Sequence, residues 1–246
     1  MSKTPARGFV KNCKKTIISL IYPVRCPVCD LPARDKKRGI CPQCRNTLEY
    51  TPGPNCIKCG KHVERDDQAF CADCRKRVHR FEQGVALYDY RSASASLYRF
   101  KYAGRAEYGH FFGNELANRF GKRITEWGIQ AIVPVPIHSS RRRVRGYNQA
   151  EEIADALGER MEIPVIKDWV IRAKRTIPQK ELGPEERQNN VKKAFIIGRS
   201  DVKLETIVII DDIYTTGSTV DAMAQLFQKA GVRKIYVITL AIGRGL

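Results

Sequence analysis

The chain has 246 residues and carries 44 Lys and Arg against 26 Asp and Glu, which gives a formal net charge of +18 at pH 7. This length accommodates one medium domain and one small one, and excludes a larger array of domains. The basic balance favours polyanionic partners such as nucleic acid, anionic lipid or phosphorylated substrates, although a generic solubilising surface has the same composition.

The first 25 residues predict a short N-terminal helix or linker. Lys11, Lys14 and Lys15 precede an apolar run over residues 17–24. That run is far too short to span a bilayer, and it lacks an A-x-A-like cleavage site. We therefore expect a helix that docks on the next segment, no stable membrane insertion, and a cytoplasmic protein.

Cysteine spacing dominates residues 26–78. Eight of the nine cysteines form four C-x-x-C pairs whose first members lie fifteen residues apart, namely Cys26/Cys29, Cys41/Cys44, Cys56/Cys59 and Cys71/Cys74. Each pair can supply two thiolates, so the eight cysteines suit two structural Zn²⁺ ions with four sulfurs each. Eight thiolates and two Zn²⁺ would bring the formal charge of +18 to roughly +14.

Two pairings of these knuckles are open. Sequential ribbons, with the first two pairs on one ion and the last two on the other, are favoured, but a cross-braced arrangement also fits the spacing. A disulfide framework is disfavoured because no secretory signal is evident and cytosolic thiols stay reduced. With few large apolar residues, this double zinc ribbon depends on metal for its folding. Cys13 is left over as a free thiol.

Strands and helices are predicted to alternate after the cysteines. Residues 84–90 alternate like a strand, and residues 92–102 and 108–127 have helical spacing. Residues 131–136 are typical of a buried strand that ends at a proline turn, and a helical pattern returns from Tyr147.

Four arginines occupy the segment over residues 136–149, which we expect to be a loop. They are Arg141, Arg142, Arg143 and Arg145. Arginines at the carboxyl end of a sheet strand form an anion-binding cluster where open α/β sheets bind ligands. Not all four can face one site, so part of this charge belongs to solvent. His138 in the same segment is expected at the surface rather than as a catalytic base.

The most specific motif lies near the C-terminus. Ile207 to Ile210 form a continuous apolar run, which is typical of a buried parallel strand. Asp211 and Asp212 follow, at the end of the strand where open sheets bind ligands. The next loop offers hydroxyls and backbone N–H groups at a helix N-terminus, which together favour an anion. Its residues are Thr215, Thr216, Gly217, Ser218 and Thr219.

This order points to a phosphosugar, and two other interpretations compete with it. An apolar strand that ends in two aspartates is also typical of the Walker B element of an ATPase. Such an enzyme needs a G-x-x-x-x-G-K-[ST] loop, which the chain lacks. The other alternative is an ordinary strand, turn and helix whose Asp and Thr residues are solvated.

The remaining pattern completes the predicted fold class. Residues 220–230 have helical spacing, Gly231 suits a helix C-terminus, and residues 235–241 form another apolar strand. Such alternation predicts an α/β domain over residues 79–246, with a parallel sheet and helices on both of its faces.

The motif over residues 207–219 resembles the phosphoribosyl-pyrophosphate (PRPP) motif of type I phosphoribosyltransferases. The resemblance implies that Asp211 and Asp212 hold the ribose hydroxyls of PRPP with Mg²⁺, and that the loop from Thr215 to Thr219 cradles the 5-phosphate.

The same resemblance assigns roles to the basic segments. It implies that the arginine loop, with Arg143, Arg145 and Gly146, faces the pyrophosphate of PRPP. It also implies that a second basic segment, with Arg175 and Arg187, belongs to a mobile loop that closes over PRPP. Such closure excludes water and protects an oxocarbenium-like centre from hydrolysis.

Nearly the whole chain resembles the ComF family, including its competence-associated ComFC branch and the GntX-type proteins. The resemblance rests on a series of motifs in order behind the cysteines: F-K-Y-A-G at residues 100–104, R-G-Y-N-Q at 145–149, Arg175 and Thr176 with Gln179, residues 187–190, and the PRPP motif. It implies a double zinc ribbon fused to a type I phosphoribosyltransferase-like domain. It also implies a role with incoming single-stranded DNA during natural transformation, beside a helicase-like ComF partner protein.

Aromatic and basic residues interleave between the first strand and the following helices. The aromatics are Tyr88, Tyr90, Tyr98, Phe100 and Tyr102, and the basic residues are Arg91, Arg99, Lys101 and Arg105. Basic grooves hold single strands by aromatic stacking worth about 1–3 kcal/mol per base. The same aromatics are also typical of a core. Three functions stay open: a DNA-uptake accessory protein that binds PRPP or a nucleotide, an active phosphoribosyltransferase with an unknown acceptor, and a PRPP-sensing regulator.

Overall fold

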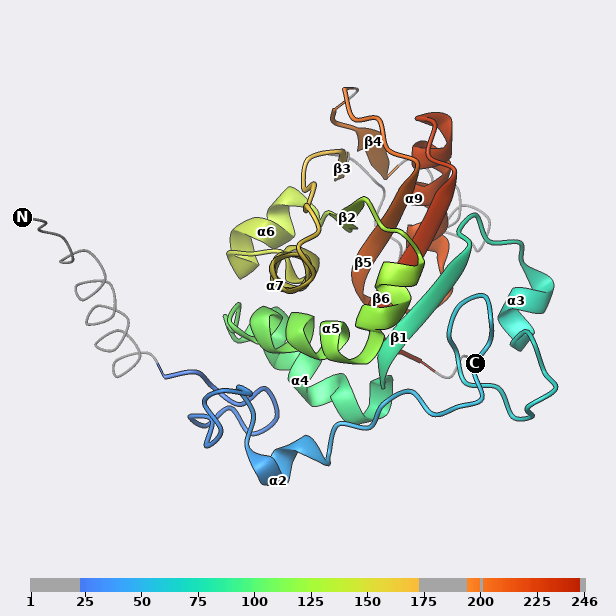
Figure 1. The fold of residues 1–246 in the computed structure, drawn as a ribbon. Coiled ribbons are helices and arrows are strands. Elements are labelled where there is room, and N and C mark those ends of the chain that lie inside the picture. The colour runs from blue at the N-terminus through green and yellow to red at the C-terminus, as the bar shows by residue number, and fades with distance from the viewer. Residues whose placement is uncertain (1–22, 173–193, 200, 244–246) are drawn as a thin grey trace, which may run out of the picture.

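The computed structural model describes residues 23–172, 194–199 and 201–243. Four parallel strands form its central sheet, in the order β1-β6-β5-β2 (Figure 1). The strands are β1 (Gln83–Asp89), β2 (Ala131–Pro134), β5 (Thr206–Tyr214) and β6 (Lys234–Ile242). This parallel α/β sheet confirms the predicted fold class.

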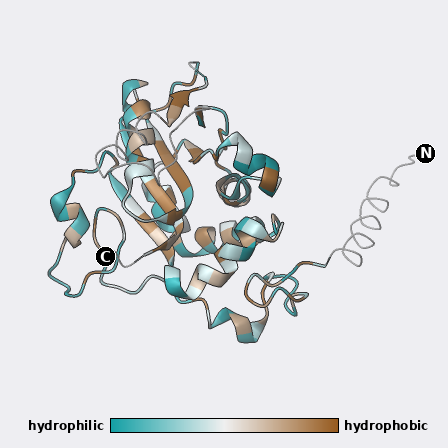
Figure 2. Ribbon diagram, turned by 180° about the vertical axis from the view of Figure 1, so that it is seen from behind, coloured by the Kyte–Doolittle hydropathy of each residue, from teal (hydrophilic) through white to brown (hydrophobic). Residues whose placement is uncertain are grey.

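Helices cover both faces of the sheet. They are α4 (Tyr90–Tyr102), α5 (Tyr108–Glu126), α7 (Gln149–Met161) and α9 (Ser218–Lys229). Along β5, Val208 and Ile210 pack with α4, α5 and α7, whereas Ile207 and Ile209 pack with α9. A strand buried on both faces must be apolar at every position. This is why the sheet strands are mostly brown in Figure 2.

Helices α5 and α7 approach each other closely through glycine. A Cβ atom on Gly113 would lie 2.5 Å from the Cβ of Ala156, and one on Gly109 would overlap Glu152. The backbones of the two helices therefore lie almost in contact, and this close packing fixes the position of α7.

Three shorter elements lie near the sheet. They are α6 (Ser139–Arg145), β3 (Val170–Arg172) and β4 (Phe195–Ile197). The prediction of an arginine loop is wrong for its central part, because α6 is a helix. Its N-terminus is capped by His138, whose Nδ1 accepts from the N–H of Ser140 at 3.2 Å, and it ends at Gly146 with φ of 82°. Strands β3 and β4 form an antiparallel pair that the sequence patterns did not indicate.

The cysteines form two ribbons on opposite faces of the sheet. The first ribbon (residues 26–44) contains α2 (Pro42–Arg45) and packs with α4 and α5, while the second (residues 56–74) shares a core with α9. Figure 1 shows them well apart, with α2 at the bottom and α3 (Ala72–Lys76) at the right.

A partly buried ion pair anchors the first ribbon to the start of α5. Arg105 donates twice to the Asp30 carboxylate, both times at 2.8 Å, and the Tyr108 hydroxyl donates to the same group at 2.6 Å. These hydrogen bonds, Arg105 first, lower the pKa of Asp30. Cys13 and most of the predicted N-terminal helix lie outside the described residues. Among the helices that the structure describes, none combines the length and apolar character needed to cross a membrane.

Candidate functional site

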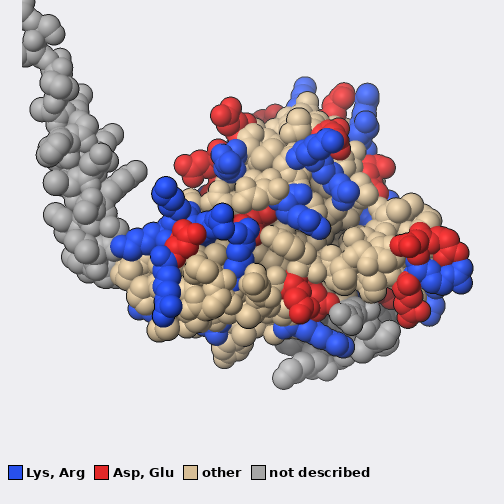
Figure 3. Space-filling view, turned by 60° about the horizontal axis from the view of Figure 1, so that its bottom comes forward, with Lys and Arg blue, Asp and Glu red and all other residues tan. Residues whose placement is uncertain are grey.

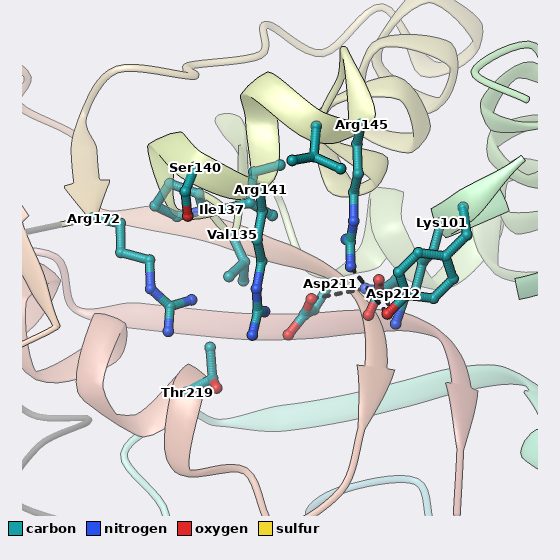
Figure 4. Close-up of a pocket in the computed structure, with 13 residues that line it drawn as sticks. Lys101, Val135, Ile137, Ser140, Arg141, Arg145, Arg172, Asp211, Asp212 and Thr219 are labelled. Carbon is teal, nitrogen blue, oxygen red and sulfur yellow. Dashed lines mark hydrogen bonds and ion pairs between the residues drawn. The ribbon is translucent and has the colours of Figure 1, made fainter. Parts of the chain in front are cut away.

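A cavity of about 500 Å³ opens at the carboxyl end of β5. Pairing of β5 with β2 stops at Ile210, so Asp211 and Asp212 lie just beyond the end of that neighbour. The volume is typical of small-molecule sites, which span about 300–1,000 Å³. Charged and hydroxyl side chains from several elements line it (Figure 4), namely Lys101, Tyr102, Ser140, Arg141, Arg145, Arg172, Asp211, Asp212 and Thr219.

The two adjacent carboxylates have different surroundings. Asp212 forms an ion pair with Lys101, with 2.9 Å between Oδ2 and Nζ. Asp211 accepts a hydrogen bond from the N–H of Asp212 at 2.8 Å. Desolvation, followed by the charge of Asp212, raises the pKa of Asp211 to about 7. Because a nearby cation favours an ionised carboxylate, a metal ion at this pair would lower that pKa again.

Arginines from two elements line the same cavity. Arg141 and Arg145 come from α6, and Arg172 comes from β3 (Figure 4). Burial and the charge of Arg141 lower the pKa of Arg172, and its Nε has no hydrogen-bond partner among the described residues. Several guanidinium groups that crowd each other in this way favour a ligand with more than one negative charge.

The R-G-Y-N-Q segment positions Arg145. Tyr147 Oη and Gln149 Nε2 both donate to the carbonyl oxygen of Phe100, the latter at 3.1 Å. The Gln149 side chain then accepts from Arg145 Nη1 at 2.9 Å. This chain of contacts joins the end of α4 to the start of α7 and directs the guanidinium along the cavity wall.

The loop from Thr215 to Thr219 turns from β5 into α9. Gly217 has φ of 75°, in the left-handed region that favours glycine. The Thr216 and Ser218 hydroxyls lie 3.2 Å apart, and Thr219 lines the cavity. The N–H groups of the first helical turn have no intrahelical partner, so the loop has the donors that an anion site needs.

The structure brings some of the predicted pyrophosphate residues to the cavity and not others. Arg145 lines it, whereas Arg143 is not among its lining residues and Gly146 ends α6. Arg142 turns instead to Glu151, at 2.6 Å. Arg175 and Arg187 lie outside the described residues.

Three charged residues that line the cavity had not been assigned to PRPP from the sequence, namely Lys101, Arg141 and Arg172. Each belongs to a segment that is conspicuous in the sequence, but only the fold brings those segments together. Lys101 is part of F-K-Y-A-G, Arg141 is one of the four clustered arginines, and Arg172 opens the second basic segment.

The eight cysteines group sequentially, as favoured from the spacing. Each group of four has all its sulfurs within 4.8 Å of one another. Tetrahedral zinc with Zn–S of about 2.3 Å places sulfurs about 3.8 Å apart. The separations are 3.9 Å for Cys29 and Cys41, and 3.7 Å for Cys59 and Cys71. The donors fit structural zinc, with no open ligand position.

Protonation gives an independent argument for a cation in these clusters. Burial, followed by hydrogen bonds to Cys29 and Cys26, raises the pKa of the Cys44 thiol to about 12. A positive ion beside Cys44 would favour its thiolate, and a divalent metal would supply that charge. Bound zinc would therefore hold each ribbon closed.

The interleaved aromatics divide between core and surface. Tyr88 and Phe100 are buried, whereas Tyr98 and Tyr102 are 66% and 61% exposed. The rings of this exposed pair lie 5.0 Å apart, and the Arg145 guanidinium carbon lies 4.9 Å from the Tyr102 ring centre. The core interpretation is thus confirmed for Tyr88 and Phe100, whereas base stacking on Tyr98 and Tyr102 stays a prediction.

Comparisons with known proteins agree with this architecture. Residues 17–75 match the family described as a double zinc ribbon domain, and residues 144–245 match the phosphoribosyl transferase domain. Among solved structures, an adenine phosphoribosyltransferase from Thermoanaerobacter pseudethanolicus is 18% identical with a TM-score of 0.33, covering 52% of this chain and 79% of that one.

Several relatives match over most of their length. Competence protein F of Haemophilus influenzae is 30% identical over 222 residues, which cover 88% of this chain and 96% of that protein. Competence protein ComFC of Bacillus subtilis is 26% identical, covering 82% and 83%. DNA utilization protein YhgH of Escherichia coli K12 is 28% identical, covering 86% and 87%. The chain belongs to the ComF family, in which a double zinc ribbon accompanies a phosphoribosyltransferase domain.

Proposed function

We propose that the cavity binds PRPP, or a related phosphosugar or nucleotide, together with Mg²⁺. One observation carries the proposal: an acidic pair, Thr219 of the anion loop and three arginines line a single cavity of about 500 Å³. Asp211 and Asp212 hold the ribose hydroxyls and Mg²⁺, and the loop from Thr215 to Thr219 takes the 5-phosphate. The pyrophosphate faces Arg141, Arg145 and Arg172.

The chemistry of each ligand part supports this assignment. PRPP has a neutral ring with two hydroxyls between a phosphate and a pyrophosphate. Carboxylates accept hydrogen bonds from hydroxyls and bind Mg²⁺, which prefers oxygen ligands. Guanidinium groups and N–H donors at a helix start bind phosphate oxygens. When bound, Mg²⁺ would be held by Asp211 and Asp212 and would partly neutralise the negative charge of the ligand.

Calorimetric titration with PRPP and Mg²⁺ tests the site. The wild type should bind, and the double variant Asp211→Asn/Asp212→Asn should lose at least about a hundredfold in affinity, because two charged contacts are removed. The variant Asp155→Asn/Asp168→Asn makes the same charge change at exposed positions on and after α7, and should bind like the wild type. Unchanged affinity in the first variant would show that the acidic pair does not hold the ligand.

We also propose that the chain handles single-stranded DNA beside a helicase-like ComF partner in the cytoplasm. The names of its relatives, which refer to competence and DNA utilization, support this role. A hollow of about 810 Å³ between the first ribbon and α5 has a strongly basic lining, and Lys and Arg side chains gather over this end of the molecule in Figure 3. Its basic residues are Arg25, Lys36, Lys37, Arg38, Arg45 and Arg160.

Salt dependence tests the DNA surface. Affinity for a short single strand should fall steeply with salt, by a slope of about −0.7 for each phosphate contacted. The variant Lys36→Ala/Lys37→Ala/Arg38→Ala should reduce that slope. A control that removes three lysines elsewhere, Lys122→Ala/Lys229→Ala/Lys234→Ala, should leave it nearly unchanged. If both triple variants show the same salt dependence, the single strand does not bind at this hollow.

A transferase and a sensor differ in the step after binding. Transfer forms a bond between C1 of the ribose and the acceptor while the bond from C1 to the pyrophosphate oxygen breaks. Pyrophosphate release is therefore the measurement. If the wild type releases pyrophosphate and Asp211→Asn does not, the protein is an enzyme. If PRPP binds but no pyrophosphate is released when nucleobases, nucleosides or DNA ends are offered as acceptors, a binding or sensing role is favoured.

A further inference from the structure

The segment that leaves the second ribbon lies against the anion loop. This strap, residues Arg77–Phe81, follows Cys74 and α3 directly. Within it, His79 is only 6% exposed, although it is a polar residue. A buried polar side chain is costly unless it is hydrogen bonded, so its partners are informative.

His79 contacts both sides of the loop at once. Its Nδ1 lies 2.8 Å from Oδ2 of Asp221, in the first turn of α9. Its Nε2 lies 3.4 Å from the hydroxyl of Tyr214, the last residue of β5. A carboxylate oxygen only accepts, so Nδ1 carries a proton, and the imidazole bridges the residues before and after the loop.

Two further hydrogen bonds from the strap reinforce this bridge, one from a side chain and one from the backbone. Arg77 Nη1 donates to the carbonyl oxygen of Thr216 at 3.1 Å, inside the loop itself. The N–H of Arg80 donates to Asp221 Oδ1 at 2.9 Å, so this carboxylate accepts from two strap residues.

Gly217 shows how tightly the loop lies on this pair. A Cβ atom at this position would overlap the Tyr214 hydroxyl and lie 2.9 Å from Cε1 of His79. The loop backbone at its left-handed residue therefore rests on the His79 and Tyr214 rings. A shift of His79 has to move the loop.

The strap is continuous with the second metal cluster. Cys56, Cys59 and Cys71 belong to the same apolar cluster as Phe81 and Tyr214. The first ribbon packs on the other face of the sheet, with α4 and α5. The second metal cluster thus lies on the same side of the sheet as the strap, and the first lies on the other side.

We infer that His79 is a positioning residue for the phosphate site, and that the second metal cluster, not the first, holds it in place. This inference rests on the proposed function, because it concerns the loop assigned to the 5-phosphate. It predicts that affinity for a monophosphate depends on the second ribbon, whereas affinity for pyrophosphate, held by arginines from α6 and β3, does not.

The test uses the full chain with ribose 5-phosphate and pyrophosphate as separate ligands. His79→Leu should weaken ribose 5-phosphate about tenfold, because the loop loses its bridge, and should leave pyrophosphate within about twofold. His79→Asn keeps a donor near the position of Nδ1 and should recover most of the affinity. Zinc content and thermal unfolding are measured on each variant, so a general loss of fold is recognised.

The metal arm uses matched cysteine pairs. Cys71→Ser/Cys74→Ser should lose about one zinc and should lose ribose 5-phosphate affinity before pyrophosphate affinity. Cys41→Ser/Cys44→Ser should lose one zinc with smaller effect on ribose 5-phosphate. Equal weakening of both ligands in His79→Leu, or wild-type affinity in that variant, would overturn the inference alone. A wild type that binds neither ligand would overturn the proposed function and the inference together.

Discussion

The folded structure disfavours ionisation of the Asp211 carboxyl group, so the stability of the protein should depend on pH. Desolvation and the neighbouring Asp212 raise its pKa from 3.8 to about 7. Between these two values the native state binds a proton that the unfolded chain has released, so the free energy of unfolding falls as the pH rises. Asparagine cannot ionise, and Asp211→Asn removes this dependence.

The magnitude is set by the size of the shift. About three pKa units at about 1.4 kcal/mol each give about 4 kcal/mol for a fully desolvated group. Asp211 keeps part of its surface exposed to the cavity, so we halve this value to about 2 kcal/mol. At pH 5.5, which lies about halfway between the unfolded and the folded pKa of Asp211, the same reasoning gives about 1 kcal/mol.

Urea denaturation of the wild type and Asp211→Asn at pH 5.5 and pH 8 measures the effect. The variant should be more stable at both, with a gain that grows from about 1 to about 2 kcal/mol. Both proteins share the cysteine clusters, so acid effects on the thiolates cancel. Asp155→Asn, at an exposed carboxylate 2.6 Å from Lys167, is the control and should change stability by less than about 1 kcal/mol. A gain independent of pH, or a less stable variant at pH 8, would refute the reasoning.

Further measurements probe the scaffold around the site. Gly113→Ala should lower the free energy of unfolding by about 1–3 kcal/mol in urea, because its Cβ would overlap Ala156. Gly121→Ala on the same helix, whose Cβ would make only ordinary contacts with Met161, should be neutral or gain up to about 1 kcal/mol. Asp30→Asn should lower the free energy of unfolding by about 1 kcal/mol at neutral pH. Because the pKa of Asp30 is lowered in the folded state, the wild type loses this stabilisation only on acidification. The stabilities of the two proteins should therefore converge at low pH. Metal analysis should find two zinc ions per chain, and a strong chelator should lower the thermal midpoint; a chain with no metal would contradict the ribbon assignment.

The local parts of the site could be predicted from the sequence because their chemistry is contiguous. An apolar strand, two carboxylates and a hydroxyl loop follow one another without interruption, and pairing within C-x-x-C is equally local. Helix α6 could not be predicted in this way. Its segment Ser139–Arg145 has one apolar residue, so periodicity gives no indication of a helix.

The parts that depend on distant segments could not be predicted. Lys101 reaches Asp212 from the end of α4, and Arg172 reaches the cavity from a strand of only three residues. Neither contact can be predicted from the spacing of residues in the sequence. The contact between His79 and Asp221 is of the same kind, since the two residues lie 142 positions apart in the sequence.

The order of strands in the sheet also constrains when the protein can fold. Strand β1 is the first of the sheet to leave the ribosome, and its neighbour in the described sheet is β6, the last one. One edge of β1 bonds to residues made earlier, as in the bridge between Tyr50 and Tyr88, but the edge that pairs with β6 has no strand partner until nearly the whole chain has been made. Contacts so distant in sequence slow folding and leave strand edges exposed during synthesis. A chain that stops before Lys234 lacks this closing strand, so truncated products should aggregate rather than accumulate as a folded, partly active protein.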